Sequence, residues 1–296
     1  SGPVTPIGIN LPNDQIVREQ YGSKSVSLSN VNEAYDGSSP ANYLQEFAWT
    51  EAEVERSRRW GSLGGEMTTN MHEVIGHASG RLAERLGGTA QPYLKEHYSA
   101  LEEARADLVG LYFLPDPKLA ELGVLPAEAQ EDIVRARYEG YTRNALLQLR
   151  RIRTGTQIEQ DHMRNRQMIV HWLIANTAAI EKRMRDGKSF YVMIDWRAFH
   201  EGVARLLDEV QRIKSEGDYE AARGLFETHG IHFEPELRDE VITRIEAVGL
   251  PSYSGFVQPR LEPVRDSTGG IIDVEISYPQ DLTSQMLEYS GKLNQQ

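Results

Sequence analysis

The chain has 296 residues, a formal net charge of −12 and no cysteine. The acidic surplus argues against a nucleic-acid partner, because phosphates are met by lysine and arginine, and the lack of cysteine excludes a disulfide scaffold and a thiolate metal site. No apolar run is long enough for a transmembrane helix, and no signal peptide is visible. We therefore expect a cytoplasmic protein with no membrane partner, built as one large domain or two smaller ones.

The chain divides into three stretches of different character. Residues 1–40 are rich in Gly, Pro, Asn and Ser, with short extended segments near 7–11 and 25–28. Helical periodicity then dominates, and it predicts helices at 43–60, 68–86, 93–113, 126–154, 161–186, 196–216, 218–229 and 235–248. Near the end, alternating segments at 259–265 and 271–277 flank a Ser-Thr-Gly-Gly turn and predict a hairpin, followed by a closing helix at 279–293.

These stretches predict a mainly α protein with a large helical domain at 41–256. The N-terminal flank (1–40) and the C-terminal hairpin and helix (257–296) are expected to pack together as a small β-containing region. The exposed sheet edges of such a region would favour association.

The most informative segment is His72-Glu73-Val74-Ile75-Gly76-His77. In the H-E-x-x-H motif of zinc peptidases, two histidines at i and i+4 share a helix face and the glutamate acts as general base. Here the second histidine is at i+5, about 140° away from the first on a regular helix. A local i→i+5 turn would bring both rings to one ion, and Gly76 lowers its cost because it has no Cβ. The alternative is a helix whose histidines bind no metal.

A second, acidic segment offers a third ligand. Glu102, Glu103 and Asp107 lie in a helical pattern that ends in an apolar Leu-Val-Gly-Leu-Tyr-Phe run, so we expect this helix to enter the core. Glu103 and Asp107 are at i and i+4 and share a face. One carboxylate could bind the metal while another holds a ligand imidazole through its free ring N–H. The alternative is a solvated acidic face.

Together the two segments resemble the H-E-x-x-G-H and E-E-x-[RK]-x-[ED] signatures of the dipeptidyl peptidase III family of zinc metallopeptidases. Residues 8–13 (Gly-Ile-Asn-Leu-Pro-Asn) and 25–31 resemble two further family segments, and residues 161–166 resemble the family's H-M-x-x-R helix. The resemblance therefore covers most of the chain. Ala104 stands where many relatives have cysteine, a change between small residues that leaves the metal site intact.

The resemblance implies a role for each motif residue. One zinc ion per chain would be bound by His72, His77 and Glu103, with Glu102 and Asp107 orienting the histidines from behind. The expected catalytic residues are Glu73, as general base for a metal-activated water, and His162, near the scissile carbonyl. The expected substrate contacts are Asn10, Asn13, Arg166 and Arg260. The spacing of His162 and Arg166 alone does not separate this role from that of an exposed basic pair on one helix face.

Members of this family are usually much longer, and these motifs lie in their C-terminal half. The N-terminal half contributes a tyrosine that assists the transition state and groups that anchor the substrate's amino end, and no residue here can be assigned those roles. We therefore expect either an excised part of a longer protein, which Ser1-Gly2 favours, or a natural short relative.

The sequence thus predicts a zinc peptidase that releases dipeptides from the N-terminus of short peptides. One alternative is a weak or inactive helical module that binds zinc or peptide but lacks half of the cleft. Another is a zinc hydrolase that acts on a non-peptide amide. Because catalysis requires the peptide to be held within bonding reach, we expect this chain alone to cleave dipeptidyl-arylamides weakly or not at all.

Overall fold

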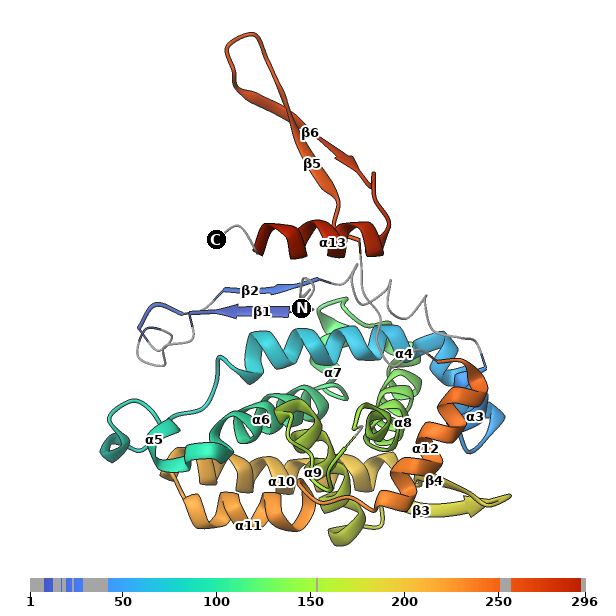
Figure 1. The fold of residues 1–296 in the computed structure, drawn as a ribbon. Helices are drawn as coiled ribbons and strands as arrows, with labels where there is room; N and C mark the ends of the chain where they lie inside the picture. Colours follow the sequence, from blue (N-terminus) through green and yellow to red (C-terminus); the bar gives the residue numbers. More distant parts are fainter. Residues whose placement is uncertain are drawn as a thin grey trace. The chain divides into compact units, whose positions relative to one another are not determined.

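The computed structural model describes residues 8–12, 17, 20–22, 24–28, 42–152, 154–250 and 257–293. The chain forms two compact units, one spanning Ile7–Leu250 and the other comprising Ser1–Pro6 and Pro251–Gln296. The larger unit is mostly helical and carries both sequence motifs (Figure 1). Among the helices of the described residues, none combines the length and apolar character needed to span a membrane.

The larger unit is built around one central helix. Its α-helices are α3 (Tyr43–Phe47), α4 (Glu51–Met71), α5 (Gln91–Leu94), α6 (Tyr98–Phe113), α7 (Pro117–Glu121), α8 (Gln130–Leu147), α9 (Asp161–Asn176), α10 (Trp196–Glu216), α11 (Tyr219–His229) and α12 (Pro235–Val248). Shorter turns between them are the π-helix η1 (His72–Gly76) and the 3-10 helices η2 (Glu84–Leu86), η3 (Lys95–His97), η4 (Ala127–Ala129) and η5 (Gln148–Arg151). α6 packs against α4, α9, α10 and η1. Its Leu101, Leu108 and Leu111 are fully buried, which confirms that the helix with the acidic motif enters the core.

Helix limits agree with the sequence where strong end signals exist. The bounds of α10 and α12 coincide with the predicted ranges 196–216 and 235–248. At the start of α10, the Asp195 side chain accepts hydrogen bonds from the amides of Arg197 and Ala198. Gly217 ends the helix with a φ of 65°, a left-handed value that favours glycine.

The predicted continuous helix at 43–60 is wrong, because the chain breaks before α4. The Thr50 hydroxyl accepts a hydrogen bond from the amide of Glu53, and Glu53 Oε2 accepts one from the amide of Trp49 at 2.8 Å. This resembles a capping box, except that Glu53 bonds the amide of Trp49, one residue before the N-cap, and its Thr-x-x-Glu signal stands in the sequence.

The predicted helix at 68–86 is also wrong in its limits. α4 runs on to Met71 and into η1, and the helical path stops at His77 instead of Leu86. Gly80 has a φ of 88°, outside the helical region, so the segment after the histidines cannot continue the helix.

The predicted helix at 161–186 ends early, because a hairpin follows it. α9 stops at Asn176, and β3 (Ile180–Arg185) pairs antiparallel with β4 (Lys188–Met193). Asp186 and Gly187 form the turn with φ values of 52° and 74°. Positive φ at both central residues is what a two-residue hairpin turn of this type requires, and Asp-Gly is its usual sequence.

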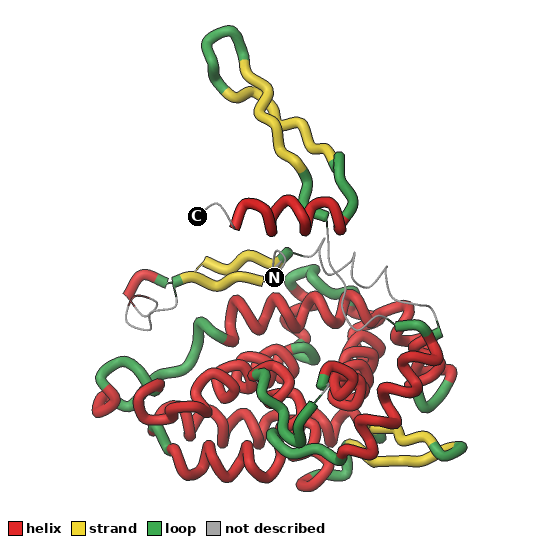
Figure 2. The backbone as a smooth tube through the Cα atoms, in the orientation of Figure 1, coloured by secondary structure: helices red, strands yellow, loops and turns green. Residues whose placement is uncertain are grey.

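The flanks contain the remaining strands. β1 (Gly8–Leu11) and β2 (Lys24–Ser27) pair antiparallel and lie against η1 within the larger unit. In the smaller unit, β5 (Arg260–Arg265) and β6 (Ile271–Ser277) form the predicted hairpin, and α13 (Leu282–Leu293) follows. Figure 2 shows helices with short two-stranded sheets, which confirms the predicted mainly α class. The domain limits at residues 40 and 256, and the packing of the two flanks on each other, stay predictions.

Candidate metal centre

The two motif histidines stand on one wide turn at the end of α4. The amide of His77 donates a hydrogen bond to the carbonyl of His72 at 3.0 Å, and His72–Gly76 forms the π-helix η1. The predicted i→i+5 bond is therefore confirmed. The wide turn brings the two rings together, with centroids 4.6 Å apart and an interplanar angle of 87°.

Gly76 allows this wide turn to approach α6 closely. A Cβ at Gly76 would lie 2.9 Å from both Cα and Cβ of Ala106. Gly110 on α6 likewise approaches α4 closely, because a Cβ added at Gly110 would lie 2.7 Å from the carbonyl oxygen of Thr68. Glycine is thus required by the packing of two helical segments, in addition to the low cost of distortion inferred from the sequence.

We expect Gly76→Ala to destabilise the protein by about 3 kcal/mol, because the added methyl meets α6 backbone that cannot move aside like a flexible side chain. Gly65→Ala in α4 is the matched control. The nearest atom to its added methyl is Arg137 Nη1 at 4.0 Å, so helix propensity should make this variant about 0.5–1 kcal/mol more stable. Urea denaturation measures both changes, and a Gly76→Ala protein as stable as the wild type would contradict the packing argument.

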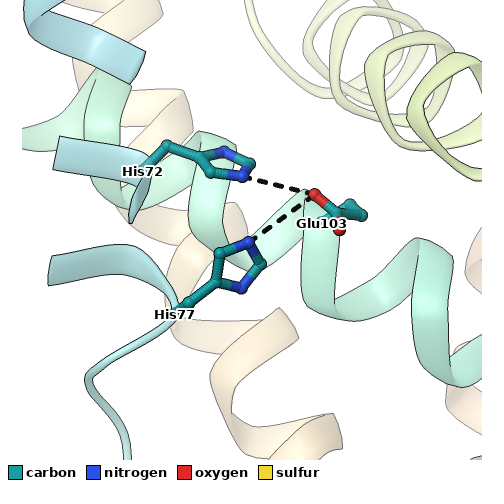
Figure 3. Close-up of side chains that lie close together, drawn as sticks. All are labelled: His72, His77 and Glu103. Atoms are coloured by element: carbon teal, nitrogen blue, oxygen red, sulfur yellow. Dashed lines mark ion pairs between the residues drawn. The ribbon is translucent and has the colours of Figure 1, made fainter. Parts of the chain in front are cut away.

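His72, His77 and Glu103 converge on one point (Figure 3). Nε2 of His72 lies 3.3 Å from Glu103 Oε2, and Nε2 of His77 lies 3.8 Å from the same oxygen. One ligand atom from each residue lies within 4.8 Å of the others. Glu103 Oε2 is buried and accepts no hydrogen bond from the described residues, a state that a bound cation would relieve. Two imidazoles and a carboxylate fit zinc, with a fourth position left for water.

Each histidine ring is held from behind by a carboxylate of α6. Nδ1 of His72 donates to Asp107 Oδ1 at 2.9 Å, and Nδ1 of His77 donates to Glu102 Oε1 at 3.1 Å. Because a carboxylate can only accept, these bonds fix the ring orientation and leave each Nε2 directed at the metal position. The two histidines are five residues apart in the sequence, and so are the two carboxylates. Because the first histidine pairs with the second carboxylate and the second histidine with the first, the two segments run antiparallel.

Charge and burial together set the protonation of the site. Burial lowers the pKa of His72, but Asp107 and Glu103 beside the ring outweigh burial and raise that pKa to about 10. Burial raises the pKa of Asp107, and the hydrogen bond from His72 overrides it and lowers the pKa. Burial raises the pKa of Glu103, and the neighbouring His72 and His162 rings outweigh burial and lower it. Negative charge is therefore concentrated around the histidines, and metal binding there would displace the proton on His72.

Asp107 is itself held by residues that no sequence pattern revealed. Its Oδ2 accepts hydrogen bonds from the Tyr141 hydroxyl at 2.8 Å and from the Asn165 side-chain amide at 3.2 Å. These residues come from α8 and α9, far from the motif in sequence. Asn165 is fully buried on α9, and a polar residue on a buried helix face is the signal that could have drawn attention to it.

Glu102 is held by two cationic side chains. Arg105, which is fully buried, donates to Glu102 Oε2 from Nε at 3.0 Å and to Oε1 from Nη2 at 2.8 Å. Arg105 also donates to the Gly76 carbonyl and to Ser79 Oγ, so it ties the end of η1 to α6. Lys214 of α10 forms an ion pair with Glu102. Arg105 fills the basic position of the acidic signature, whereas Lys214 belongs to no motif.

Three predicted catalytic and substrate residues lie on the helical elements that form this centre or pack against it. Nδ1 of His162 is 3.4 Å from Glu103 Oε2, and its ring is 56% exposed. Arg166, one turn further along α9, donates to Gln148 Oε1 at 3.2 Å. Glu73 is half-buried in η1, and its backbone carbonyl accepts a hydrogen bond from Ser25 Oγ.

The structure does not locate three further predicted contacts relative to the centre. Asn10 lies in β1 opposite Ser25, and its side chain is outside the described part. Asn13 lies outside the described residues. Arg260 begins β5 in the smaller unit, whose position relative to the larger unit is not determined. The substrate roles of all three stay predictions.

In this helical unit, the turn η1 carries two histidines and faces the carboxylates of α6. Such an arrangement is typical of metal-dependent peptidases. The sequence model of peptidase family M49 matches residues 1–89 and 85–247. The chain therefore belongs to peptidase family M49, and the resemblance to dipeptidyl peptidase III found in its motifs is confirmed.

Several relatives carry the name dipeptidyl peptidase 3. The protein of Rattus norvegicus is 28% identical over 309 residues, which cover 88% of this chain and 40% of the relative. The protein of Homo sapiens is 26% identical over 313 residues, which cover 88% of this chain and 41% of the relative. The chain thus spans less than half the length of these relatives.

Solved structures give the same result. DPP III from Caldithrix abyssi aligns with a TM-score of 0.62 and 28% identity, covering 84% of this chain and 44% of that one. Dipeptidyl-peptidase III from Corallococcus sp. strain EGB aligns with a TM-score of 0.64 and 21% identity, covering 84% and 42%. The second comparison bears on the fold alone.

Proposed function

We propose that this chain provides the zinc centre of a peptidase that releases dipeptides from the N-terminus of short peptides. The observation that carries the proposal is the convergence of both histidine Nε2 atoms on the buried oxygen of Glu103, with a carboxylate behind each ring. The names of the relatives support the substrate class. The absence of cysteine supports a reducing compartment such as the cytoplasm.

In this proposal, His72, His77 and Glu103 would hold one zinc ion. The bound ion would act as a Lewis acid and lower the pKa of a coordinated water from 15.7 toward about 7. Glu73 would take the proton of the attacking water and deliver it to the leaving amine.

The other motif residues would assist without reacting. His162, beside Glu103, would donate to the developing oxyanion of the scissile carbonyl. Arg166 would meet the peptide backbone, as would Asn10 and Asn13, and Arg260 would line the cleft. Glu102 and Asp107 would keep the ligand rings oriented.

A second candidate function is a zinc-binding module with little or no peptidase activity of its own. The exposed surface around the centre favours it. Val74 and Ile75, next to the general base, are 56% and 38% exposed, and the His162 ring is also open to solvent. The described residues of the larger unit would hold a substrate from one side, and poor positioning can cost orders of magnitude in rate.

Zinc content and peptidase assays separate these functions. We expect about one zinc ion per chain by elemental analysis, with removal by a strong chelator and recovery on zinc addition. The zinc form is then incubated with a dipeptidyl-arylamide and with a short peptide, and the products are identified by mass spectrometry. Zinc-dependent release of dipeptides supports the peptidase, and bound zinc without any hydrolysis supports the module. A protein that binds no zinc would contradict both.

A further inference from the structure

We propose that Lys214 is a positioning residue for the metal centre: through Glu102 it fixes the ring of His77. The inference rests on the proposed function, because it assumes that His77 is a metal ligand. Lys214 lies in the last turn of α10, and its side chain is only 3% exposed. Its Nζ lies 2.7 Å from Glu102 Oε2.

The position of Lys214 on α10 is one where an apolar residue would be expected. Val210 and Ile213 lie on the same face of the helix and are buried in the core. An ammonium group is strongly disfavoured in such surroundings unless a counter-charge accompanies it. The Glu102 carboxylate supplies that charge, so the pairing accounts for a lysine that the packing of α10 does not require.

Lys214 is on α10, whereas the other partners of Glu102 are on α6 and at the end of the histidine turn. Oε1 of Glu102 accepts from His77 Nδ1 and from Arg105 Nη2, while Oε2 accepts from Arg105 Nε and faces Lys214. Arg105 is three residues from Glu102 on α6, and its other hydrogen bonds go to Gly76 and Ser79, so it joins Glu102 to the histidine turn. Within the described part of the chain, Lys214 is the contact that anchors this carboxylate to a helix other than α6 and the histidine turn. Rotation of Glu102 away from His77 would break it.

Positioning and simple electrostatics predict opposite effects of removing this lysine. A positive charge close to a cation site repels the cation, so Coulomb's law alone predicts that the protein without Lys214 binds zinc more tightly. If Lys214 instead holds Glu102 against His77, its removal frees the ring and weakens binding. Partners that act on metal ligands in this way typically contribute 10–100-fold to metal affinity.

The test compares Lys214→Met, which removes the charge at similar volume, with Lys214→Arg, which keeps it. Zn²⁺ affinity is measured by competition with a chromophoric chelator, and ligand geometry by the visible spectrum of the Co²⁺ form. We expect Lys214→Met to bind Zn²⁺ about tenfold more weakly and to shift the Co²⁺ bands, and we expect Lys214→Arg to recover most of the loss. Lys214→Gln, which keeps a hydrogen-bond donor, should show roughly a threefold loss and serves if the methionine variant does not fold.

Lys118→Met is the control, because Lys118 also lies 2.7 Å from a carboxylate, that of Glu121, but is 65% exposed. It should leave both the affinity and the spectrum unchanged. If Lys214→Met, or Lys214→Gln where the former does not fold, binds Zn²⁺ as tightly as the wild type or more tightly, the positioning role is wrong. Failure of the wild type itself to bind Zn²⁺ would instead overturn the proposed function, so the two failures are distinguishable.

Discussion

Replacing Glu103 with alanine should lower the affinity for Zn²⁺ by about 10³-fold or more. Glu103 Oε2 is the atom that faces Nε2 of both His72 and His77. Removing one of three ligands should forfeit a substantial part of the roughly 10 kcal/mol or more with which such sites bind zinc, and about 4 kcal/mol corresponds to 10³-fold. The measurement is chelator competition, supported by elemental analysis of the purified variant.

His162→Ala is the matched control for this experiment. Its Nδ1 is 3.4 Å from the same Glu103 oxygen, similar to the distance of the His72 Nε2. The His162 ring is far more exposed, and among the described residues no carboxylate orients it from behind as Asp107 orients His72. We therefore expect His162→Ala to retain zinc. Full zinc retention by Glu103→Ala, or loss of zinc from His162→Ala, would show that the three ligands have been wrongly assigned.

The local geometry of the centre could be predicted from the sequence because it depends on spacing. Two histidines five residues apart cannot face one ion on a regular helix, so a shared ion predicts the wide turn that His72–Gly76 forms. The sequence did not reveal that Gly76 also packs against Ala106, because that contact depends on how α4 and α6 cross. Local spacing therefore predicts the turn but not the reason why its glycine is required.

The supporting residues could not be predicted for a similar reason. Tyr141, Asn165 and Lys214 reach the centre from three helices, and their roles exist only after those helices pack around α6. By contrast, two errors in the helix limits were avoidable. Both signals are local: the Thr50 cap lies inside the predicted helix at 43–60, and the Asp186-Gly187 pair, at the end of the predicted helix at 161–186, signals a hairpin.

Glu73→Gln should abolish peptide hydrolysis while leaving zinc in place. A general base typically contributes 10²–10⁴-fold to the rate, so we expect whatever kcat/KM the wild-type chain has for a dipeptidyl-arylamide to fall by about 10³-fold. Glutamine has nearly the same shape but cannot accept the proton of the attacking water. Because Glu73 is not among the three converging ligands, Zn²⁺ affinity should change by less than about threefold.

Glu55→Gln, an exposed position on α4, is the control and should match the wild type in rate and zinc content. The comparison with Glu103→Ala makes the assignment specific, since that variant should lose metal and activity together whereas Glu73→Gln should lose activity alone. If Glu73→Gln also lost its zinc, the glutamate would be needed to build the turn that carries His72 and His77. If it kept both zinc and rate, another group would have to take the proton. Only loss of rate with full zinc content assigns Glu73 as the base, because the metal centre is then intact and the missing function is proton transfer.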